Sequence, residues 1–327
     1  MKHVVGIDVS KAKLDCLWLR DPESRKVKTK VIANDASGYS TLALWLTKTI
    51  AALPEEIMVV MEATGIYHEK LAMALHERGF TVFVINPAQI KSFAKSQGTT
   101  HKTDKQDSLT IALYGQATHR LTAWRPEPAE IRELKALIAR LEALEIDFRR
   151  EHNRLEKAEF NLSSETVLQS IHMMLAELEK EKRRIEKEID DHIDRHPRLK
   201  NDRKLLASIP GIGPVMTRLM LSVIHSRNFK SAKQVAAYLG VIPTLVESGV
   251  FKGRSSMSKK GPASVRAKLY MAAVAATQWN PDILHLRQRL LSRGKTKMQA
   301  LGAAMRKLVH ICFGVLKTQT EYSPQVA

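Results

Sequence analysis

The chain has little cysteine and no long apolar run. Only Cys16 and Cys312 occur in 327 residues, far apart and without a pairing pattern, which is typical of a reducing compartment. No apolar stretch approaches the ~20 residues of a membrane span, and the N-terminus leads into a strand pattern without a signal peptide. These absences exclude a disulfide scaffold and a membrane-spanning protein, and we expect a cytoplasmic location.

Acidic residues are scarce in the last quarter of the chain. Lys and Arg total 52 against 34 Asp and Glu, giving a net charge of +18 and a pI near 9.9. From Ser248 onward there are fourteen basic residues and only two acidic ones, Asp282 and Glu321. Such an excess predicts a polyanionic partner. Because no amphipathic lipid anchor accompanies it, the pattern favours nucleic acid over a membrane surface.

Four acidic residues nevertheless stand at positions where they can converge. Asp8 lies inside an apolar run and Glu62 ends another, while Asp104 and Asp107 are three apart at the start of a helical pattern and share one helix face. Clustered carboxylates repel one another unless a cation neutralises them, and hard oxygen ligands suit Mg²⁺. We therefore predict a magnesium site that acts on phosphates. The alternative is that these acids are helix caps or surface residues, which fits Asp104 better than Asp8.

The first 120 residues alternate between strand and helix signals. Strands are predicted over residues 4–10, 14–20, 26–33, 57–62 and 80–86, and helices over 37–53, 67–78, 87–96 and from about 103. This order predicts a ribonuclease-H-like α/β domain, in which three antiparallel strands continue into parallel ones. In that layout the strands carrying Asp8 and Glu62 are neighbours, and their polar ends face the last helix.

Residues 130–195 show heptad spacing in two stretches. The apolar positions are Ile131, Leu134, Ile138, Leu141, Phe148 and Leu155, then Ile171, Leu175, Leu178, Ile185, Ile189 and Ile193. Residues 161–164 separate the stretches, and Pro197 closes the second one. We predict two long helices that form a coiled-coil arm, either as a hairpin or between protomers. A solvated helical spacer is the alternative, and an arm for oligomerisation is favoured because an isolated helix pair buries little surface.

The remainder reads as a compact, basic and mainly helical domain. Between two helical stretches, 202–207 and 215–224, residues 208–214 have the pattern Ser-Ile-Pro-Gly-Ile-Gly-Pro. Gly211 and Gly213 in such a turn are typical of a helix-hairpin-helix motif, where the next helix N-terminus binds a phosphate. A plain turn between helices is the alternative reading.

A serine followed by glycine, Ser248-Gly249, precedes a run of basic residues. Its hydroxyl could attack a phosphate, with nearby cations stabilising the charge on its oxygens. Ser255, Ser256 and Ser258 are rivals, and most loop serines bond only their own backbone. The basic residues expected to bind nucleic acid here are Lys252, Arg254, Lys259, Lys260, Arg266 and Lys268.

Taken together, these motifs resemble the DEDD-type transposases of bacterial insertion sequences, the one-ten family, also called bridge recombinases. The matching pieces follow the family's order along nearly the whole chain, and Ser108, where a small residue such as Ala is expected, is a minor departure. They are Gly-Ile-Asp8-Val-Ser, Glu62-Ala-Thr-Gly, Ile85-Asn-Pro, Lys102-Thr-Asp104-Lys-Gln-Asp107, Ser208-Ile-Pro-Gly-Ile-Gly, Glu247-Ser248-Gly249 and Ala303-Ala-Met-Arg-Lys-Leu.

The resemblance implies a RuvC-like domain over residues 1–125, a coiled-coil helical hairpin over 126–198 and a C-terminal transposase domain over 199–327. It implies that Asp8, Glu62, Asp104 and Asp107 hold Mg²⁺ and that Ser248 is the nucleophile. It further implies donor and target DNA, a structured noncoding guide RNA and a dimer that assembles into a tetramer. The chain has no Gly-x-x-x-x-Gly-Lys-Ser/Thr loop for ATP, and rejoining through a serine ester needs none.

Two other functions remain open at this point. A RuvC-like junction nuclease that uses water would need the four acids but not Ser248. A non-catalytic nucleic-acid-binding scaffold would need neither.

Overall fold

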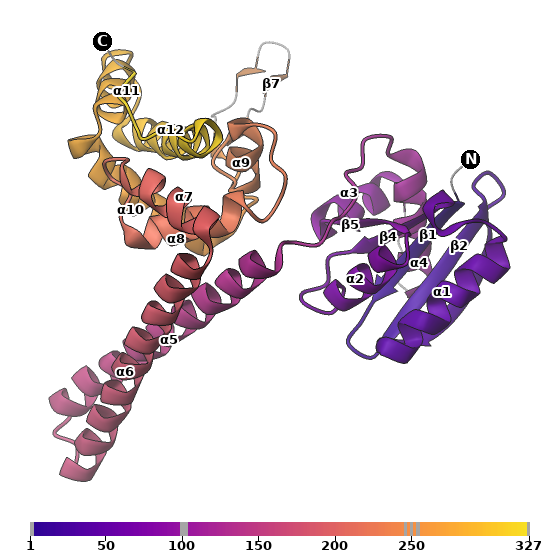
Figure 1. Ribbon diagram of the computed structural model, residues 1–327, viewed down its shortest axis with the longest axis horizontal. Helices are drawn as coiled ribbons and strands as arrows, with labels where there is room; N and C mark the ends of the chain where they lie inside the picture. The colour runs from indigo at the N-terminus through magenta and orange to yellow at the C-terminus, as the bar shows by residue number, and fades with distance from the viewer. Residues whose placement is uncertain (1–2, 99–103, 245–246, 249–250, 253–255, 326–327) are drawn as a thin grey trace. The chain divides into compact units, whose positions relative to one another are not determined.

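The computed structural model describes residues 3–98, 104–244, 247–248, 251–252 and 256–325. The chain divides into two compact units, residues 1–126 and 127–327, and each is described by itself (Figure 1). These two units give one boundary, between residues 126 and 127. The three-domain division, with boundaries after residues 125 and 198, stays a prediction.

A mixed five-stranded sheet forms the centre of the N-terminal unit. Its strands are β1 (His3–Val9), β2 (Lys13–Asp21), β3 (Lys26–Ala33), β4 (Ile57–Glu62) and β5 (Thr81–Ile85), in the order β3-β2-β1-β4-β5. The first three strands pair antiparallel, and β4 and β5 continue the sheet in parallel with β1. The predicted ribonuclease-H-like strand order is confirmed, including the adjacency of the strands that carry Asp8 and Glu62.

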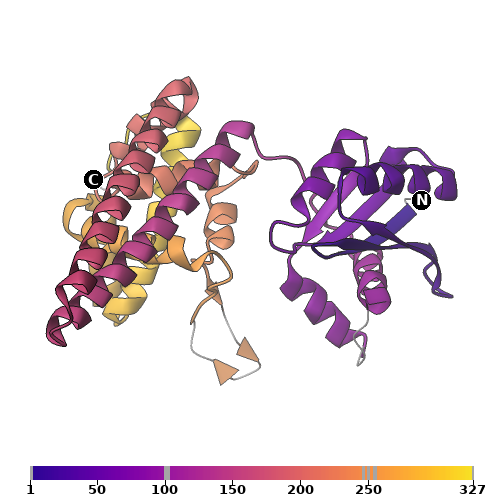
Figure 2. The ribbon, with the colours of Figure 1, turned by 90° about the horizontal axis from the view of Figure 1, so that it is seen from below.

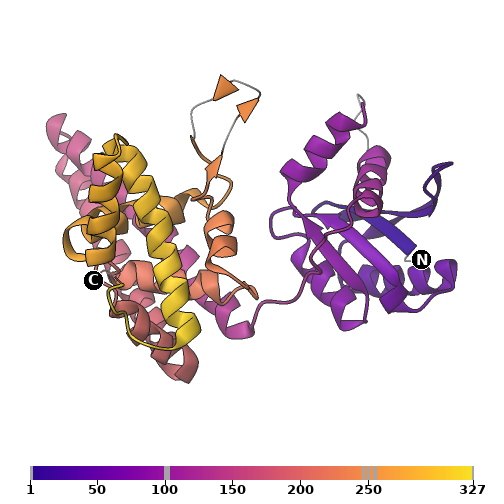
Figure 3. The same ribbon diagram turned by 90° about the horizontal axis from the view of Figure 1, so that it is seen from above.

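Helices cover both faces of this sheet (Figures 1 and 3). The helices are α1 (Ala36–Ile50), the 3₁₀ helix η1 (Pro54–Glu56), α2 (Glu69–Glu77), α3 (Pro87–Ser96) and α4 (Asp104–Ala117). Val5, Ile7 and Val9 of β1 pack with α1 and α2, whereas Val4 packs with Ile111 of α4 on the opposite face. Alternate β1 residues therefore serve two separate cores, as the two-residue period of a strand requires.

Two long helices open the second unit. α5 (Ala129–Phe160) and α6 (Glu165–Arg195) lie side by side, joined by residues 161–164 (Figures 1 and 2). The predicted pair of helices thus folds back within one chain. Coiled-coil packing and a role in oligomerisation stay predictions.

The rest of this unit is a cluster of helices. They are α7 (Pro197–Ala207), α8 (Pro214–Ile224), α9 (Ala232–Tyr238), α10 (Ala263–Trp279), α11 (Pro281–Ser292) and α12 (Lys297–Thr318). Their core is continuous with the root of the α5–α6 pair, through residues such as Ile131 and Ile189. Pro197 begins α7 rather than only closing the preceding helix, because proline suits the first position of a helix.

Two short ladders interrupt the helices between α9 and α10. β6 (Pro243–Thr244) pairs with β9 (Ser256–Met257), and β7 (Glu247–Ser248) pairs with β8 (Phe251–Lys252), both antiparallel. The second ladder lies beyond the first, away from the helices (Figures 1 and 3).

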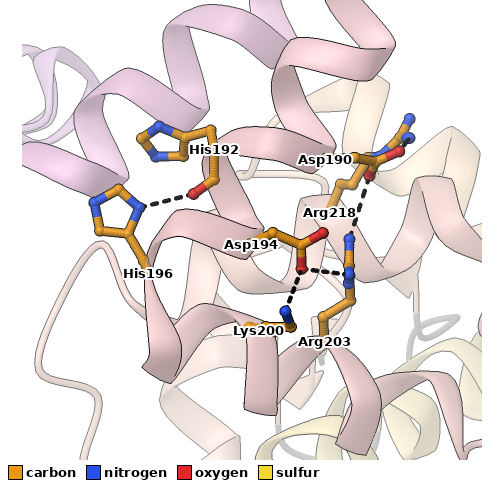
Figure 4. A network of polar contacts seen from close by, with 7 residues as sticks. All are labelled: Asp190, His192, Asp194, His196, Lys200, Arg203 and Arg218. Carbon is orange, nitrogen blue, oxygen red and sulfur yellow. Dashed lines mark hydrogen bonds and ion pairs between the residues drawn. The ribbon is translucent and has the colours of Figure 1, made fainter.

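Ion pairs attach the α5–α6 pair, the arm, to helices of the neighbouring cluster (Figure 4). The end of the arm that they hold is its root. Asp190 of α6 accepts hydrogen bonds from Arg218 of α8, with Nη2 at 2.7 Å, and Asp194 accepts one from Arg203 of α7, also at 2.7 Å. On the other helix of the arm, Glu142 accepts from Lys268 of α10 at 2.7 Å. Because both helices are tied, the arm and the cluster form one compact unit.

The two cysteines are buried and unpaired with each other. Burial raises the pKa of both thiols, that of Cys312 to about 12, so neither is a reactive thiolate at neutral pH. Within the part of the chain that the structure describes, no helix has both the length and the apolar character needed to cross a membrane.

Candidate active site

Asp8 and Glu62 stand at the same edge of the sheet. β1 and β4 are parallel and in register from His3 opposite Ile57 to Ile7 opposite Met61. Continuing that register by one residue sets Asp8 beside Glu62. Both side chains are half-buried. They therefore occupy the carboxyl ends of two adjacent parallel strands, at the edge where ligands bind in many α/β folds.

Two glycines fix how α4 crosses these strands. A Cβ on Gly6 would lie 2.2 Å from the Ser108 carbonyl oxygen and 2.6 Å from the Ala112 nitrogen. A Cβ on Gly115 would lie 2.6 Å from Cγ2 of Val60 and 3.3 Å from Cγ1 of Val4. The helix thus touches β1 directly and runs opposite to it, because its later residues meet the earlier residues of the strand.

The start of α4 consequently lies toward the edge that carries Asp8 and Glu62. Gly6 and Asp8 project from the same face of β1, since they are two residues apart. α4 begins at Asp104, and Asp107 precedes Ser108, the residue that covers Gly6. The backbone therefore brings all four predicted acidic positions to one region of the N-terminal unit.

The side chains do not form a complete cation cage among the described residues. There, no three His, Cys, Asp or Glu side chains are grouped closely enough to hold a metal ion. The side chain of Asp104 lies outside the described residues, so the tetrad is traced through its backbone alone. The donor chemistry fits Mg²⁺, which takes one or two carboxylates and keeps several waters.

A fifth acid and a buried serine support this region. Asp15 of β2 lies directly opposite Asp8 in the sheet and pairs with Lys13 Nζ at 3.1 Å. Ser108 is 1% exposed, and its Oγ donates to the Asp15 carbonyl oxygen at 2.8 Å. Ser108, which stands where the family resemblance suggested a small residue such as Ala, therefore has a hydrogen-bonded hydroxyl and ties α4 to β2.

His68 lies close in sequence after Glu62, at the start of α2. Its pKa is lowered, chiefly because burial disfavours the imidazolium, although Glu69 and the carbonyls of Thr64 and Gly65 oppose this. The imidazole is therefore mainly neutral at neutral pH. Sequence reasoning gave no role to this histidine.

The segment that carries Ser248 has a firmly packed base. The β6–β9 ladder closes it, and Lys259 N donates to Gly240 O at 3.1 Å. A Cβ on Gly240 would lie 2.6 Å from Gly261 N, and one on Gly261 would lie 2.4 Å from Tyr238 O. Two backbones meet here at a distance that only glycine permits. Neither glycine was singled out from the sequence, although each follows a helix end or precedes a helix start.

Ser248 itself belongs to β7, opposite Phe251 of β8. Its side chain and that of Lys252 lie outside the described residues, as does the whole of Arg254. The nucleophile assignment therefore stays a prediction. Ser258, a rival, has a buried hydroxyl without a hydrogen-bond partner among the described residues.

The predicted basic residues divide into two groups. Lys259 and Lys260 are exposed and available to a phosphate backbone. Arg266 donates to the Gly261 carbonyl, and Lys268 is tied to Glu142 and lies 3.9 Å from Glu145. Internal partners already take up both of these side chains, so contact with nucleic acid would have to displace them.

The two glycines of the 208–214 turn also differ. Gly211 has φ +94°, and its Cβ position lies 2.6 Å from the Cβ of Ala276 in α10, so packing alone requires glycine there. Gly213 caps α8 without a side-chain hydrogen bond and has open space around its Cβ position. Phosphate binding at this helix N-terminus stays a prediction, and Gly213 is the residue placed to allow it.

Comparison with known proteins identifies the family. A family model described as transposase matches residues 5–158, and one described as "Transposase IS116/IS110/IS902 family" matches residues 203–288. This chain belongs to the IS110 family of transposases. The first match spans the four carboxylates, and the second spans Gly211, Gly213 and Ser248.

Relatives of this IS110-family transposase include two full-length proteins. The pilin gene-inverting proteins of Moraxella bovis and Moraxella lacunata are each 29% identical over 328 residues, covering 99% of both chains. Among solved structures, RuvC of T. thermophilus in complex with a Holliday junction substrate is similar with a TM-score of 0.28 and 16% identity. That alignment covers 38% of this chain and 100% of the RuvC chain, and a likeness this weak does not bear on function.

Proposed function

We propose that this transposase is a site-specific DNA recombinase that cuts and rejoins strands through an ester between Ser248 and a DNA phosphate. The Moraxella relatives are named for inverting a gene. Inversion requires that each cut end be joined again in a new orientation. A covalent protein–DNA ester retains the energy of the cleaved phosphodiester bond, so rejoining needs no nucleotide hydrolysis.

The proposed step is a transesterification. The Ser248 oxygen forms a bond to phosphorus and loses its proton to a base, while the bond between phosphorus and a strand oxygen breaks; that oxygen takes up a proton, from the protonated base or from water, and leaves as a hydroxyl. Rejoining is the reverse reaction, with the hydroxyl of the new strand as nucleophile. Because a serine hydroxyl is a weak nucleophile at neutral pH, the site must activate it.

The convergence of four carboxylate positions at one edge of the N-terminal sheet carries this proposal. In it, Asp8, Glu62, Asp104 and Asp107 hold Mg²⁺, with Asp8 and Glu62 presented by adjacent parallel strands and the other two by the start of α4. A bound divalent ion would polarise the scissile phosphate and stabilise charge on the oxygens. The close Gly6–α4 contact sets the spacing between the two halves of the tetrad.

The partners that we propose are donor and target DNA together with a structured noncoding guide RNA from the same element. Base pairing would then select the sequence, while protein cations hold the backbones. The charge of the chain supports this, because its excess of +18 suits two kinds of phosphate backbone. In the assembled dimer or tetramer, the carboxylates of one protomer and the serine of another would form a composite site.

The deciding experiment traps the intermediate. Labelled donor and target DNA are incubated with the protein, guide RNA and Mg²⁺, and products are separated on a denaturing gel with and without protease. We expect a protease-sensitive protein–DNA adduct that Ser248→Ala abolishes and Ser256→Ala, on the exposed strand β9, retains. Asp8→Asn should reduce adduct formation at least about 10³-fold.

Two results would contradict the proposed function and support a different one. Intact cleavage by Ser248→Ala, with protein-free ends, would indicate a nuclease that uses water. Strand exchange that survives Asp8→Ala together with Glu62→Ala would indicate a scaffold whose acids are not catalytic.

A further inference from the structure

Helices α9 and α12 bring together basic side chains that have no acidic neighbour on either helix. Arg306 and His310 lie one turn apart on α12, with Lys307 beside them, and Lys233 lies on α9. α9 packs against α12 (Figure 1). Neither helix contains an aspartate or a glutamate. We call these four residues the α9–α12 cluster.

Two nitrogens of this cluster are buried without a partner. Among the described residues, no group accepts from or donates to Nε of Arg306 or Nε2 of His310. Buried polar groups are almost always hydrogen-bonded in folded proteins, so a pair of adjacent exceptions indicates a missing partner. Nε of Arg306 is a donor, and Nε2 of His310 is one when that nitrogen carries a proton, so together with the positive charge the cluster suits an anionic group with several acceptor oxygens.

The cluster is also electrostatically strained. The pKa of His310 is lowered by burial first, and then by the charges of Arg306 and Lys307 on its own helix and of Lys233 on α9. These cations repel one another and oppose protonation of the imidazole. A bound anion would relieve the repulsion and favour the protonated ring.

We propose that the α9–α12 cluster binds a backbone phosphate of the nucleic acid on which this transposase acts. Arg306 can present a planar guanidinium to phosphate oxygens, a geometry that arginine matches well, while Lys233 and Lys307 add charge. Between residues 203 and 327 the chain has twenty basic and three acidic residues. An external polyanion is therefore the counter-charge that suits this region best.

The α9–α12 cluster lies near the segment that carries Ser248, so a phosphate contact there would help to position the nucleic acid for strand cleavage. This role rests on the proposed function. Lys233 lies near the start of α9, and Gly240, two residues after its end, contacts the Lys259–Lys260 turn. α9 has seven residues and is thus about 10 Å long. A phosphate held by the cluster would lie one short helix from the base of the segment that carries Ser248.

The test measures binding, without strand cleavage. In a Ser248→Ala background, the double variant Lys233→Gln/Arg306→Gln is compared with Lys297→Gln/Lys317→Gln, which removes the same charge from exposed positions at the two ends of α12. Fluorescence anisotropy is recorded for a short duplex DNA and, separately, for a structured RNA hairpin across a salt series. Thermal melting and sedimentation verify fold and oligomeric state.

We expect Lys233→Gln/Arg306→Gln, the cluster variant, to make log affinity fall less steeply with log salt. For one of the two probes the size of the slope should decrease by about 2. That corresponds to about a tenfold change in affinity between 50 and 200 mM salt. The probe affected identifies DNA or RNA as the source of the phosphate. In ¹³C-histidine NMR, saturating nucleic acid should raise the pKa of His310 in the unsubstituted cluster.

Three outcomes would overturn the proposal. The cluster and control variants could show equal slopes for both probes, or the His310 pKa could stay unchanged at saturation. Alternatively, the cluster variant could change the oligomeric state while leaving binding intact, which would indicate that a carboxylate of another copy is the partner. Because no outcome depends on ester formation, failure here is distinguishable from failure of the serine mechanism.

Discussion

Replacing Gly6 by alanine should disable the carboxylate site while leaving every carboxylate in place. The added Cβ would lie 2.2 Å from the Ser108 carbonyl oxygen and 2.6 Å from the Ala112 nitrogen, both backbone atoms of α4. Real Cβ contacts essentially never fall below 3.0 Å. Since a backbone cannot rotate away as a side chain can, α4 must move from β1 by at least the 0.8 Å that separates 2.2 from 3.0 Å.

This displacement of α4 should lower the cleavage rate more than it lowers the stability of the domain. Overpacking of this kind typically costs about 1–3 kcal/mol, a loss that many folded domains tolerate. Asp8 remains on β1, but Asp104 and Asp107 move with α4. A misplacement of about 1 Å can cost ~10²-fold in rate. We therefore expect Gly6→Ala to remain folded and to lose about a hundredfold in strand cleavage.

Two other glycines provide controls on helices. Gly115→Ala, also in α4, would meet a side-chain atom, Cγ2 of Val60, at 2.6 Å and no backbone atom among its nearest contacts, so its effect on cleavage should be smaller. Gly314→Ala, within α12, meets nothing within 4 Å and should stabilise the protein by about 0.5–1 kcal/mol. Cleavage rates and melting curves of all three variants provide the measurement. Wild-type cleavage by Gly6→Ala would refute the tetrad spacing argued from β1 and α4.

Two further predictions concern the second unit. Tyr322→Phe removes the hydrogen bond that the phenol donates to the buried Asp282 carboxylate at 2.8 Å; burial first, then Asp282, raises the Tyr322 pKa to about 12. The substitution should lower the unfolding free energy by about 1–3 kcal/mol in a denaturant titration, and an unchanged midpoint would contradict it. Ile146→Gln with Met173→Gln, at exposed apolar positions of the arm, should reduce assembly in sedimentation without lowering the melting temperature, whereas an unchanged oligomer would argue against an assembly role.

The secondary structure of the first unit was predictable because each element has a local signal. Apart from His3, Asp8 and Glu62, β1 and β4 are apolar, because these strands are buried on both faces. The edge strand β3 alternates instead, and α3 begins at Asn86-Pro87, where the asparagine side chain accepts from Ala88 N at 2.8 Å. The adjacency of Asp8 and Glu62 followed from the strand order alone.

The remaining features depend on contacts between distant residues. Heptad spacing predicted the two long helices α5 and α6. It did not distinguish the positions that face helices α7–α12 from those that face outward. Ile138 and Ile189, predicted as seam residues of a coiled coil, belong to the shared core at the arm root. Similarly, a lysine in α10 gives no sequence signal that its partner is Glu142, 126 residues earlier.

The charge distribution links the arm, the helical cluster and the proposed substrate. Residues 127–202 contain fifteen basic and nineteen acidic residues, so local pairs such as Arg184–Glu181 can balance them. Residues 203–327, with twenty basic and three acidic, cannot be balanced internally, and their self-repulsion destabilises the compact state. Nucleic acid should therefore stabilise this region itself, by about 2.7 kcal/mol at a hundredfold excess over Kd. Hydrogen exchange should show that protection in α9, α10 and α12, and equal protection of β1 and β4 would contradict this division of charge.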